Sequence, residues 1–351
     1  MARGPLGHLL HRGYSLARYR IGPAIGHEIM RHRSPHQIRL RWPEGEIPLG
    51  ARVCVFAHWD GAGDVRPHVL HHVRALAAAG LSVVFVTNAG FLRPDALEAL
   101  KLVCAGIIVR RNVGYDFGAW REGIEQLALP RANTTMVAIA NDSVYGPLRS
   151  LNELFASIDF DAADVWGCTD SWQSRYHLQS YLMAFSPRVV ASDTWRMFWA
   201  GVVPTWSKTW LIRLFEIGLT QSLLKAGFSC RAIWPYKTLT QDIDVGLLRD
   251  RKPDDANEGP NMADPIVQVR RKHVLRLREA VADRSPLNPT SDLWRQLLAA
   301  RFPFIKRELL RDNPSRVPDV AEWRDVAATV SDASLAPIER DLQRTLKNRA
   351  P

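Results

Sequence analysis

The sequence contains few cysteines. The four, Cys54, Cys104, Cys168 and Cys230, lie at least fifty residues apart and form no CxxC pair. With four widely spaced cysteines and no CxxC pair, the sequence suggests neither a disulfide framework nor a thiolate zinc site. Four dispersed cysteines are typical of a protein from a reducing compartment, and we expect a cytoplasmic location.

Long apolar runs are also missing. The longest stretches, such as residues 81–86, are shorter than ten residues, whereas a transmembrane helix needs about 20. The first thirty residues carry Arg12, Arg18 and Arg20 among glycine and proline and have no continuous apolar block. We therefore expect neither a membrane-spanning segment nor a secretory signal.

The composition is that of an ordinary folded protein. The chain has 351 residues, of which 46% are hydrophobic and 23% charged, which excludes a disordered or fibrous protein. The net charge of +10 is uneven, because residues 1–42 contain eight arginines and one glutamate. Such a basic arm can bind an anionic membrane surface, here the inner leaflet, or can simply be a solvated terminus. No nucleic-acid-binding motif follows it, so we expect no nucleic-acid partner.

Proline and glycine mark the end of the basic arm. Pro43, Gly45, Pro48 and Gly50 come just before a regular pattern begins. The pattern predicts three parts: a basic arm over residues 1–47, an α/β domain over residues 48–245, and a mainly helical extension over residues 246–351.

Short apolar runs alternate with helical patterns in the α/β domain. Strands are predicted over residues 52–57, 81–87, 106–110, 136–140 and 164–168. Helices are predicted near residues 67–79, 95–103 and 117–127, with the longest over 206–225. This alternation indicates an α/β, Rossmann-like fold, a mostly parallel sheet flanked by helices with right-handed crossovers.

Polar clusters follow four of the predicted strands. They are His58 with Asp60, Thr87 with Asn88, residues 112–118 and residues 141–146. The carboxyl ends of parallel strands meet at one edge of the sheet, where ligands bind in folds of this class. These clusters are therefore the first candidates for a binding site.

The third cluster, RNVGYDFGAW, contains two glycines around an aspartate. Gly114 and Gly118 permit a ligand to approach the backbone closely. Asp116 either caps the following helix or faces the ligand, and the neighbouring Asn112 and Tyr115 favour a ligand.

The fourth cluster, NDSVYGP, offers hard oxygen ligands. Asp142, with its amide and hydroxyl neighbours, suits Mg²⁺ or Mn²⁺ that holds a diphosphate. One carboxylate is sufficient if a nucleotide supplies the other oxygens. The alternative is a turn formed by Asn, Asp, Gly and Pro.

Two further segments contain candidate polar residues. In YHLQSY, a strand would place His177 and Gln179 on one face and Leu178 on the other; a structural histidine is the alternative. Glu216 lies beside an apolar helical stripe that ends at Gly227. It is either a solvated surface carboxylate or a general base for an acceptor hydroxyl.

Together these motifs resemble the rhamnan synthesis F family, regarded as rhamnosyltransferases with a GT-A type glycosyltransferase fold. The resemblance covers roughly residues 50–325. Its motifs are VCVFAHWD, VVFVTNAG, RNVGYDFGAW, NDSVYGPL, DVWGCTDS, YHLQSYLMAF, NPTSDLWRQLL and FPFIKRELLRDNP. It implies a GT-A-like fold for residues 48–245 and transfer of a sugar, L-rhamnose from dTDP-rhamnose, onto a surface polysaccharide or a lipid-linked glycan.

The resemblance also implies roles for individual residues. The residues expected to bind the donor are Thr87, Asn88, Asn112, Gly114, Asp116 and Gly118. Asp142 stands where GT-A enzymes carry an acidic metal-binding motif, although NDS replaces the full DxD. Asp170, His177 and Gln179 are expected on the acceptor side.

The same resemblance implies that Glu216 is the catalytic base. Many inverting GT-A enzymes carry a Glu-Asp pair with a leucine three residues and a glycine eleven residues after the Asp, and Glu216, Leu219 and Gly227 reproduce that spacing. The hypothesis is an inverting glycosyltransferase at the cytoplasmic face of the membrane. The alternative is an inactive scaffold on the same fold that binds a glycan or a nucleotide sugar.

Overall fold

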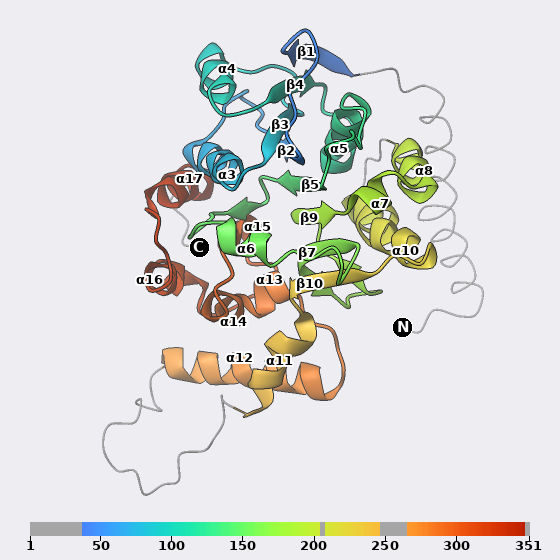
Figure 1. Cartoon of the computed structure of the whole chain (residues 1–351). Helices are drawn as coiled ribbons and strands as arrows, with labels where there is room; N and C mark the ends of the chain where they lie inside the picture. Colours follow the sequence, from blue (N-terminus) through green and yellow to red (C-terminus); the bar gives the residue numbers. More distant parts are fainter. Residues whose placement is uncertain (1–36, 204–207, 246–264, 348–351) are drawn as a thin grey trace, which may run out of the picture.

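The computed structural model describes residues 37–203, 208–245 and 265–347 (Figure 1). Its main sheet contains β1 (Ile38–Trp42), β2 (Arg52–His58), β3 (Ser82–Thr87), β4 (Gly106–Arg110), β5 (Met136–Asn141), β7 (Val165–Ser171), β8 (His177–Leu178), β9 (Leu182–Phe185) and β10 (Cys230–Trp234). A second, two-stranded sheet pairs β6 (Val144–Tyr145) with β11 (Ile305–Lys306).

Helices connect the strands and continue to the end of the described chain. The first group is α3 (Pro67–Ala78), α4 (Pro94–Lys101), α5 (Tyr115–Glu125), α6 (Asn152–Ala156), α7 (Pro187–Val190), α8 (Asp193–Gly201), α9 (Lys208–Leu211) and α10 (Ile217–Lys225). The second group is α11 (Tyr236–Val245), α12 (Pro265–Ala282), α13 (Pro289–Asp292), α14 (Trp294–Ala299), α15 (Arg307–Asp312), α16 (Trp323–Ala328) and α17 (Ala336–Leu346).

The order of the strands creates a switch point beside β2. The main sheet runs β1-β4-β3-β2-β5-β9-β7-β10, with β8 paired to β7. From β2 the chain moves outward to β3 and β4, then returns to the other side of β2 as β5, and these four strands are parallel. Ligands bind at such a reversal because the loops diverge there and leave a crevice.

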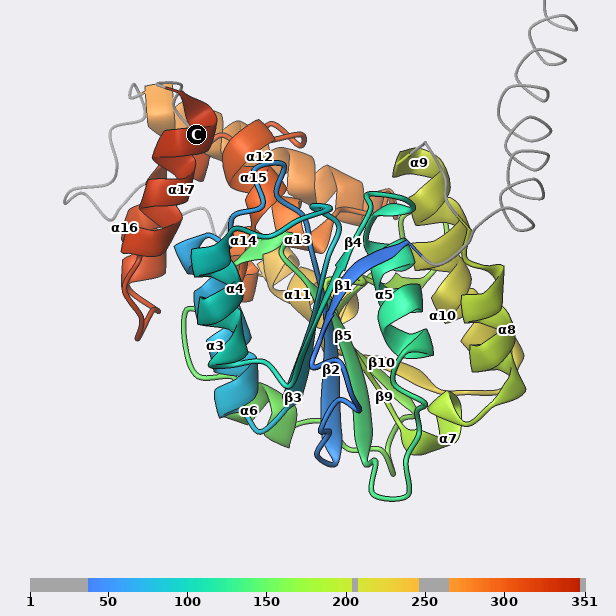
Figure 2. The ribbon, with the colours of Figure 1, turned by 90° about the horizontal axis from the view of Figure 1, so that it is seen from above.

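Alternating strand residues supply two hydrophobic cores. Phe56 and Phe85 pack with α3, α4 and α6 on one face, whereas Val55 and Val86 pack with α5, α8 and α10 on the other. Strands buried on both faces have continuous apolar sequences, as β2 and β3 do. Figure 2 shows the two helical layers on either side of the sheet.

The C-terminal helices lie beyond the carboxyl ends of the strands. The β6–β11 pair joins this region to the loop after β5. Phe302 and Phe304 extend the first core, and Trp294 and Leu342 belong to a third core with Tyr145. Within the described ranges, no helix has the length and apolar character needed to cross a membrane.

The α/β class, the mostly parallel sheet and the helical C-terminal extension are confirmed, with several local differences, among them the unpredicted strand β10, which pairs parallel with β7. The strand β1 lies inside the segment predicted as a basic arm, where Ile38–Trp42 pairs antiparallel with β4. The unpredicted β9 lies between β5 and β7 and is antiparallel to both. The predicted helix over 206–225 contains a π-helical turn at Ile212–Glu216, and its residues 206–207 lie outside the described chain. The division into three parts remains a prediction.

Gly123 allows α5 to lie directly on the sheet. A Cβ at this position would be 2.6 Å from a Val55 methyl group and 2.9 Å from one of Val86. We expect Gly123→Ala to lower the free energy of unfolding by about 1–3 kcal/mol, the usual cost of overpacking a core. Urea unfolding of both proteins measures this difference.

Gly201 provides the matched control, because a Cβ there would have no atom within 4 Å. Gly201→Ala should leave stability unchanged or raise it slightly, since alanine favours a helix. Equal stability of the Gly123→Ala and Gly201→Ala proteins would contradict the close packing of α5.

Candidate functional site

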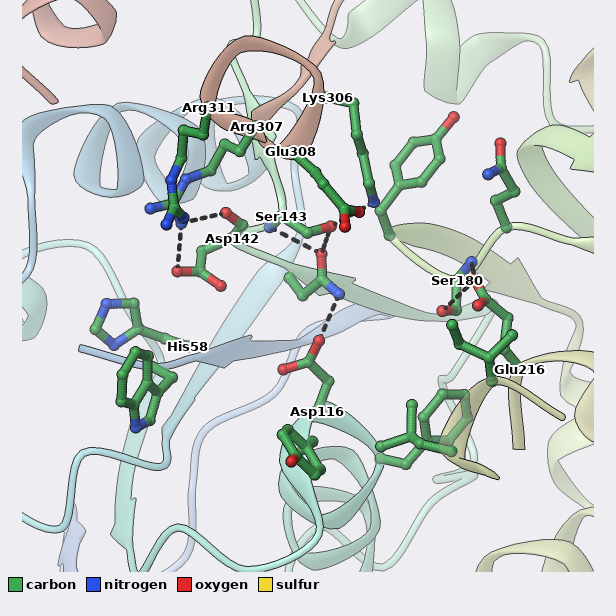
Figure 3. Close-up of a pocket in the computed structure, with 18 of the residues that line it drawn as sticks. His58, Asp116, Asp142, Ser143, Ser180, Glu216, Lys306, Arg307, Glu308 and Arg311 are labelled. Carbon is green, nitrogen blue, oxygen red and sulfur yellow. Dashed lines mark hydrogen bonds and ion pairs between the residues drawn. The ribbon is translucent and has the colours of Figure 1, made fainter. Parts of the chain in front are cut away.

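A cavity of about 840 Å³ lies at the switch point between β2 and β5 (Figure 3). The loops after β2, β3, β4 and β5 contribute to its wall, together with the segment after β7, the π-helical turn and the C-terminal region. The lining residues from the predicted set are Asn88, Asn112, Asp116, Asp142, His177, Gln179 and Glu216. Residues up to 128 positions apart in the sequence therefore meet in one pocket.

The loop after β3 is tied to its neighbours by buried hydrogen bonds. Thr87 is fully buried, and its hydroxyl lies 3.0 Å from His58 Nδ1. Asn88 donates to the Tyr115 carbonyl at 2.9 Å and accepts a hydrogen bond from Arg110. Thr87 thus supports the pocket from behind, and Asn88 links the loops after β3 and β4 in its wall.

Asp116 lies at the start of α5, directly after Gly114. Gly114 has a φ of +84°, a left-handed conformation that glycine adopts without strain. The Asp116 carboxylate accepts a hydrogen bond from the Asn141 side chain at 2.9 Å. Desolvation, reinforced by the negative charge of Asp142, raises the pKa of Asp116 to about 7. The Asp116 side chain therefore bonds to Asn141 at the end of β5. It does not cap α5, which has no side-chain cap hydrogen bond.

Asp142 is paired with an arginine from the C-terminal region. The Nη1 of Arg307 lies 2.9 Å from Asp142 Oδ2 and donates to the Asp142 carbonyl at 2.7 Å. Both side chains are largely buried, at 13% and 14% exposure. A buried carboxylate and guanidinium in this geometry form a strong, charge-assisted hydrogen bond.

Glu216 and Gln179 lie in the part of the wall nearest the π-helical turn. Glu216 Oε1 accepts hydrogen bonds from the amide and the hydroxyl of Ser180, at 3.0 and 2.9 Å. Gln179 accepts from the Thr169 hydroxyl at 2.7 Å. His177 Nδ1 lies 2.8 Å from the Arg175 carbonyl, and His177 reaches the same cavity, whereas Leu178 is in the core. The alternation expected of this segment is present, although β8 is only two residues long.

Three of the predicted site residues, besides Thr87, lie behind the wall. Gly114 provides the turn before α5. Gly118 packs against the backbone, because a Cβ there would be 2.4 Å from the Val113 carbonyl oxygen. Asp170 is 6% exposed and accepts a hydrogen bond from the Tyr236 amide, and burial raises its pKa. The contacts of Gly118 and Asp170 are with the protein itself.

Residues outside the predicted set also line the pocket. Trp59 and Tyr115 follow β2 and β4 and expose 53% and 43% of their surface. Lys306, Arg307 and Arg311 come from the C-terminal region. Trp59 could have been predicted as a pocket residue, because it stands between His58 and Asp60 in the polar cluster after β2. The three cations stand in the motif FPFIKRELLRDNP, where no local pattern indicates which way they point.

A buried carboxylate on α17 lies beside two arginines of the pocket wall, Arg66 and Arg307. Asp341 is 3% exposed, accepts a hydrogen bond from the Tyr145 hydroxyl at 2.7 Å, and pairs with Arg66. Its Oδ2 lies 3.6 Å from Arg307 Nη2. Because each ion here has a partner of opposite charge, the network can remain ionised out of water.

We expect Asp116 to make stability depend on pH. Its pKa rises from 3.8 to about 7 on folding, so the folded state keeps a proton that the unfolded chain releases. Between these values, stability therefore falls as pH rises, by about 2–4 kcal/mol. Asp116→Asn removes this contribution, so the variant should gain stability over the wild type from pH 4 to pH 7.

Chemical unfolding at several pH values measures the effect. Asp161→Asn is the control, since Asp161 is exposed, and its curve should run parallel to that of the wild type. A parallel curve for Asp116→Asn as well would show that Asp116 is ionised in the folded protein.

Comparisons with known proteins match the chain to one family model and to a curated relative. The model of the family described as rhamnan synthesis protein F matches residues 83–247. The virulence protein VirA of Vibrio anguillarum is 31% identical over 221 residues, which are 62% of this chain and 66% of VirA. The chain thus spans slightly less than two thirds of this relative's length.

Solved glycosyltransferases are among the structural matches. GlyE of Streptococcus pneumoniae is 9% identical, with a TM-score of 0.41, over 84% of this chain and 64% of GlyE. Mannosyltransferase PcManGT of Pyrobaculum calidifontis, solved with GDP-Man and Mn²⁺, is 13% identical, with a TM-score of 0.34, over 93% of this chain and 88% of its own. TM-scores below 0.5 carry no argument about function. The family match over residues 83–247 confirms the resemblance to the rhamnan synthesis protein F family that the motifs indicated.

Proposed function

We propose that this protein is a glycosyltransferase that uses a nucleotide sugar. The observation that carries the proposal is the convergence of Asp116, Asp142 and Glu216, from three separate elements, on one cavity at the switch point of the sheet. Family membership supports the finer proposal, an inverting transfer of L-rhamnose from dTDP-rhamnose onto a surface polysaccharide or a lipid-linked glycan.

Glu216 is the proposed catalytic base. Both of its hydrogen bonds to Ser180 end on Oε1, and we assign Oε2 to the acceptor hydroxyl. The Ser180 contacts fix the orientation of the carboxylate, which a general base needs to take a proton in the transition state. The acceptor oxygen then attacks the anomeric carbon, and the bond from that carbon to the diphosphate oxygen breaks.

The acceptor side of the pocket is assigned to His177 and Gln179. Gln179 also lies 3.5 Å from polar atoms of Asn288 and Thr290, which belong to the motif NPTSD. Asp170 stays in the proposal as a residue that holds this wall through the Tyr236 amide. Amide and imidazole groups suit sugar hydroxyls, since they both donate and accept hydrogen bonds.

The nucleoside is assigned to the other end of the pocket. The indole of Trp59 and the phenol of Tyr115 are exposed there, and aromatic faces stack on bases of any sequence. Asn88, Asn112 and Asp116 offer polar groups beside them, and the remaining donor residues, Thr87, Gly114 and Gly118, shape these loops.

The predicted divalent cation at Asp142 does not fit the contacts of this residue. Its Oδ2 is bonded to Arg307, so a cation would have to displace the guanidinium from this oxygen or bind beside its positive charge. We therefore assign no step of the reaction to Mg²⁺ or Mn²⁺.

The cytoplasmic location and the contact with the inner membrane surface also remain proposals. The location rests on the dispersed cysteines, and the membrane contact rests on the arginines of the basic arm, of which residues 1–36 lie outside the described chain. The pairing of Asp142 with Arg307 also favours the second candidate, an inactive scaffold that binds a glycan or a nucleotide sugar, because that pairing occupies the expected metal ligand.

Glu216→Gln tests the proposed chemistry. We expect the rate of sugar transfer to fall by a factor of about 10² to 10⁴, because the amide cannot accept the proton. Donor affinity should be unchanged, since the amide keeps an oxygen that accepts from Ser180. The measurement is release of dTDP from dTDP-rhamnose with a rhamnan acceptor, next to a donor titration.

Glu153→Gln is the control, because Glu153 is exposed and pairs with Arg301 outside the pocket. Full activity of Glu216→Gln would remove the base assignment. Donor binding without any turnover by the wild type would favour the scaffold.

Trp59→Ala tests the nucleoside end. We expect the affinity for dTDP to fall by about 1–3 kcal/mol, the usual contribution of base stacking. Trp172 is equally exposed, at 53%, but lies outside the pocket lining. Trp172→Ala should therefore bind dTDP as the wild type does. Isothermal titration compares the three proteins, and an equal loss in both variants would contradict a stacking role of Trp59.

A further inference from the structure

Three cations reach the pocket from one short segment of the C-terminal region. Lys306 ends β11, and Arg307 and Arg311 are the first and fifth residues of α15. Pairing of β11 with β6 sets this segment beside the end of β5, and the Arg307 amide donates to the Ser143 carbonyl at 3.0 Å. The backbone therefore fixes where the three side chains begin.

The cations point to the same place. Figure 3 shows both arginine side chains reaching from α15 toward Asp142, with Lys306 on the other side of Ser143. Lys306 Nζ lies 3.0 Å from the Ser143 hydroxyl. Two arginines four residues apart on a helix repel each other slightly. Asp142 and Asp341 already lie beside Arg307. The Glu308 carboxylate lies between Ser143 and Lys306 in Figure 3, so a further anion would share these cations with the carboxylates.

Arg307 is held rigidly before any ligand binds. Asp142 lies at one side of its guanidinium and Asp341 at the other, and its side chain is 13% exposed. Arg66, which also lines the pocket, pairs with the same Asp341 and with Asp60. Donors that are already oriented lose little entropy on binding, which favours a charged ligand of fixed geometry.

We propose that Lys306, Arg307 and Arg311 bind a diphosphate and neutralise its charge in place of a divalent cation. The planar guanidinium group of Arg311 matches two phosphate oxygens, and Arg307 and Lys306 add positive charge beside it. In sugar transfer the negative charge on the leaving diphosphate grows as the glycosidic bond breaks, and these cations lie where that charge develops.

Two molecules can supply this chemistry. One is the nucleotide sugar, in which case the inference rests on the proposed function. The other is a lipid-linked acceptor, whose isoprenyl chain also ends in a diphosphate. Trp59, at the proposed nucleoside end, lines the same cavity as the cations. We therefore assign the site to the nucleotide, and the lipid diphosphate serves as the competing ligand in the test.

The experiment measures binding of dTDP and of geranyl diphosphate by isothermal titration, each in EDTA and in Mn²⁺. It compares the wild type with Arg311→Gln and Lys306→Gln. Arg307 is left intact, because its loss would leave buried carboxylates unpaired. Arg301→Gln is the control, since Arg301 is an exposed cation outside the pocket.

We expect the wild type to bind dTDP in EDTA with an affinity close to that in Mn²⁺. Arg311→Gln and Lys306→Gln should each weaken binding about tenfold or more, as for a lost charge-assisted hydrogen bond. Arg301→Gln should match the wild type. Geranyl diphosphate should bind at least tenfold more weakly than dTDP.

Other results overturn the inference in distinguishable ways. Binding of dTDP that needs Mn²⁺, or that is unaffected by both pocket variants, removes the cation site but leaves the proposed glycosyltransferase intact. Tighter binding of geranyl diphosphate, with the same loss in the variants, overturns the assignment to the nucleotide. No binding of either ligand by the wild type removes the site and the proposed function together.

Discussion

The ion pair between Asp142 and Arg307 joins the sheet to the C-terminal region, and the geometry of the pocket depends on it. Two charges are costly to take out of water, and removing one partner of such a pair costs about 3–5 kcal/mol. Here the cost is offset by a network, because Asp341 also approaches Arg307 and accepts from Tyr145. The end of β5, the β6–β11 pair and α17 therefore hold one another in place.

The fold was predictable where local pattern and burial agree. The strands β2 to β5 are short apolar runs bounded by glycine and polar residues, and burial on both faces requires that composition. The strand β1 was not predictable, because IRLRW reads as part of a basic segment and its pairing with β4 is a matter of backbone hydrogen bonds. The strand β9 was not predicted, because its four apolar residues, LMAF, do not distinguish a strand from another kind of buried segment.

The site was predictable to the extent that it follows the strand ends. Asn88, Asp116 and Asp142 reach one pocket because parallel strands end at the same edge. Spacing along the chain cannot show which polar side chains face the cavity and which bond to neighbouring residues. Thr87, for example, bonds to His58. Nor can it place Arg307, which lies 165 residues after Asp142 in the sequence.

The charges of the pocket explain why a distant segment must complete it. Asp116, Asp142 and Glu216 are all acidic and line the same cavity, and the proposed diphosphate would add further negative charge to it. Burial and Asp142 already raise the pKa of Asp116 to about 7, a sign that uncompensated negative charge is unfavourable here. Cations from Ile305–Lys306 and α15 correct this balance. Because they lie outside residues 83–247, the strand-end loops and the cations of the proposed diphosphate site come from separate parts of the chain.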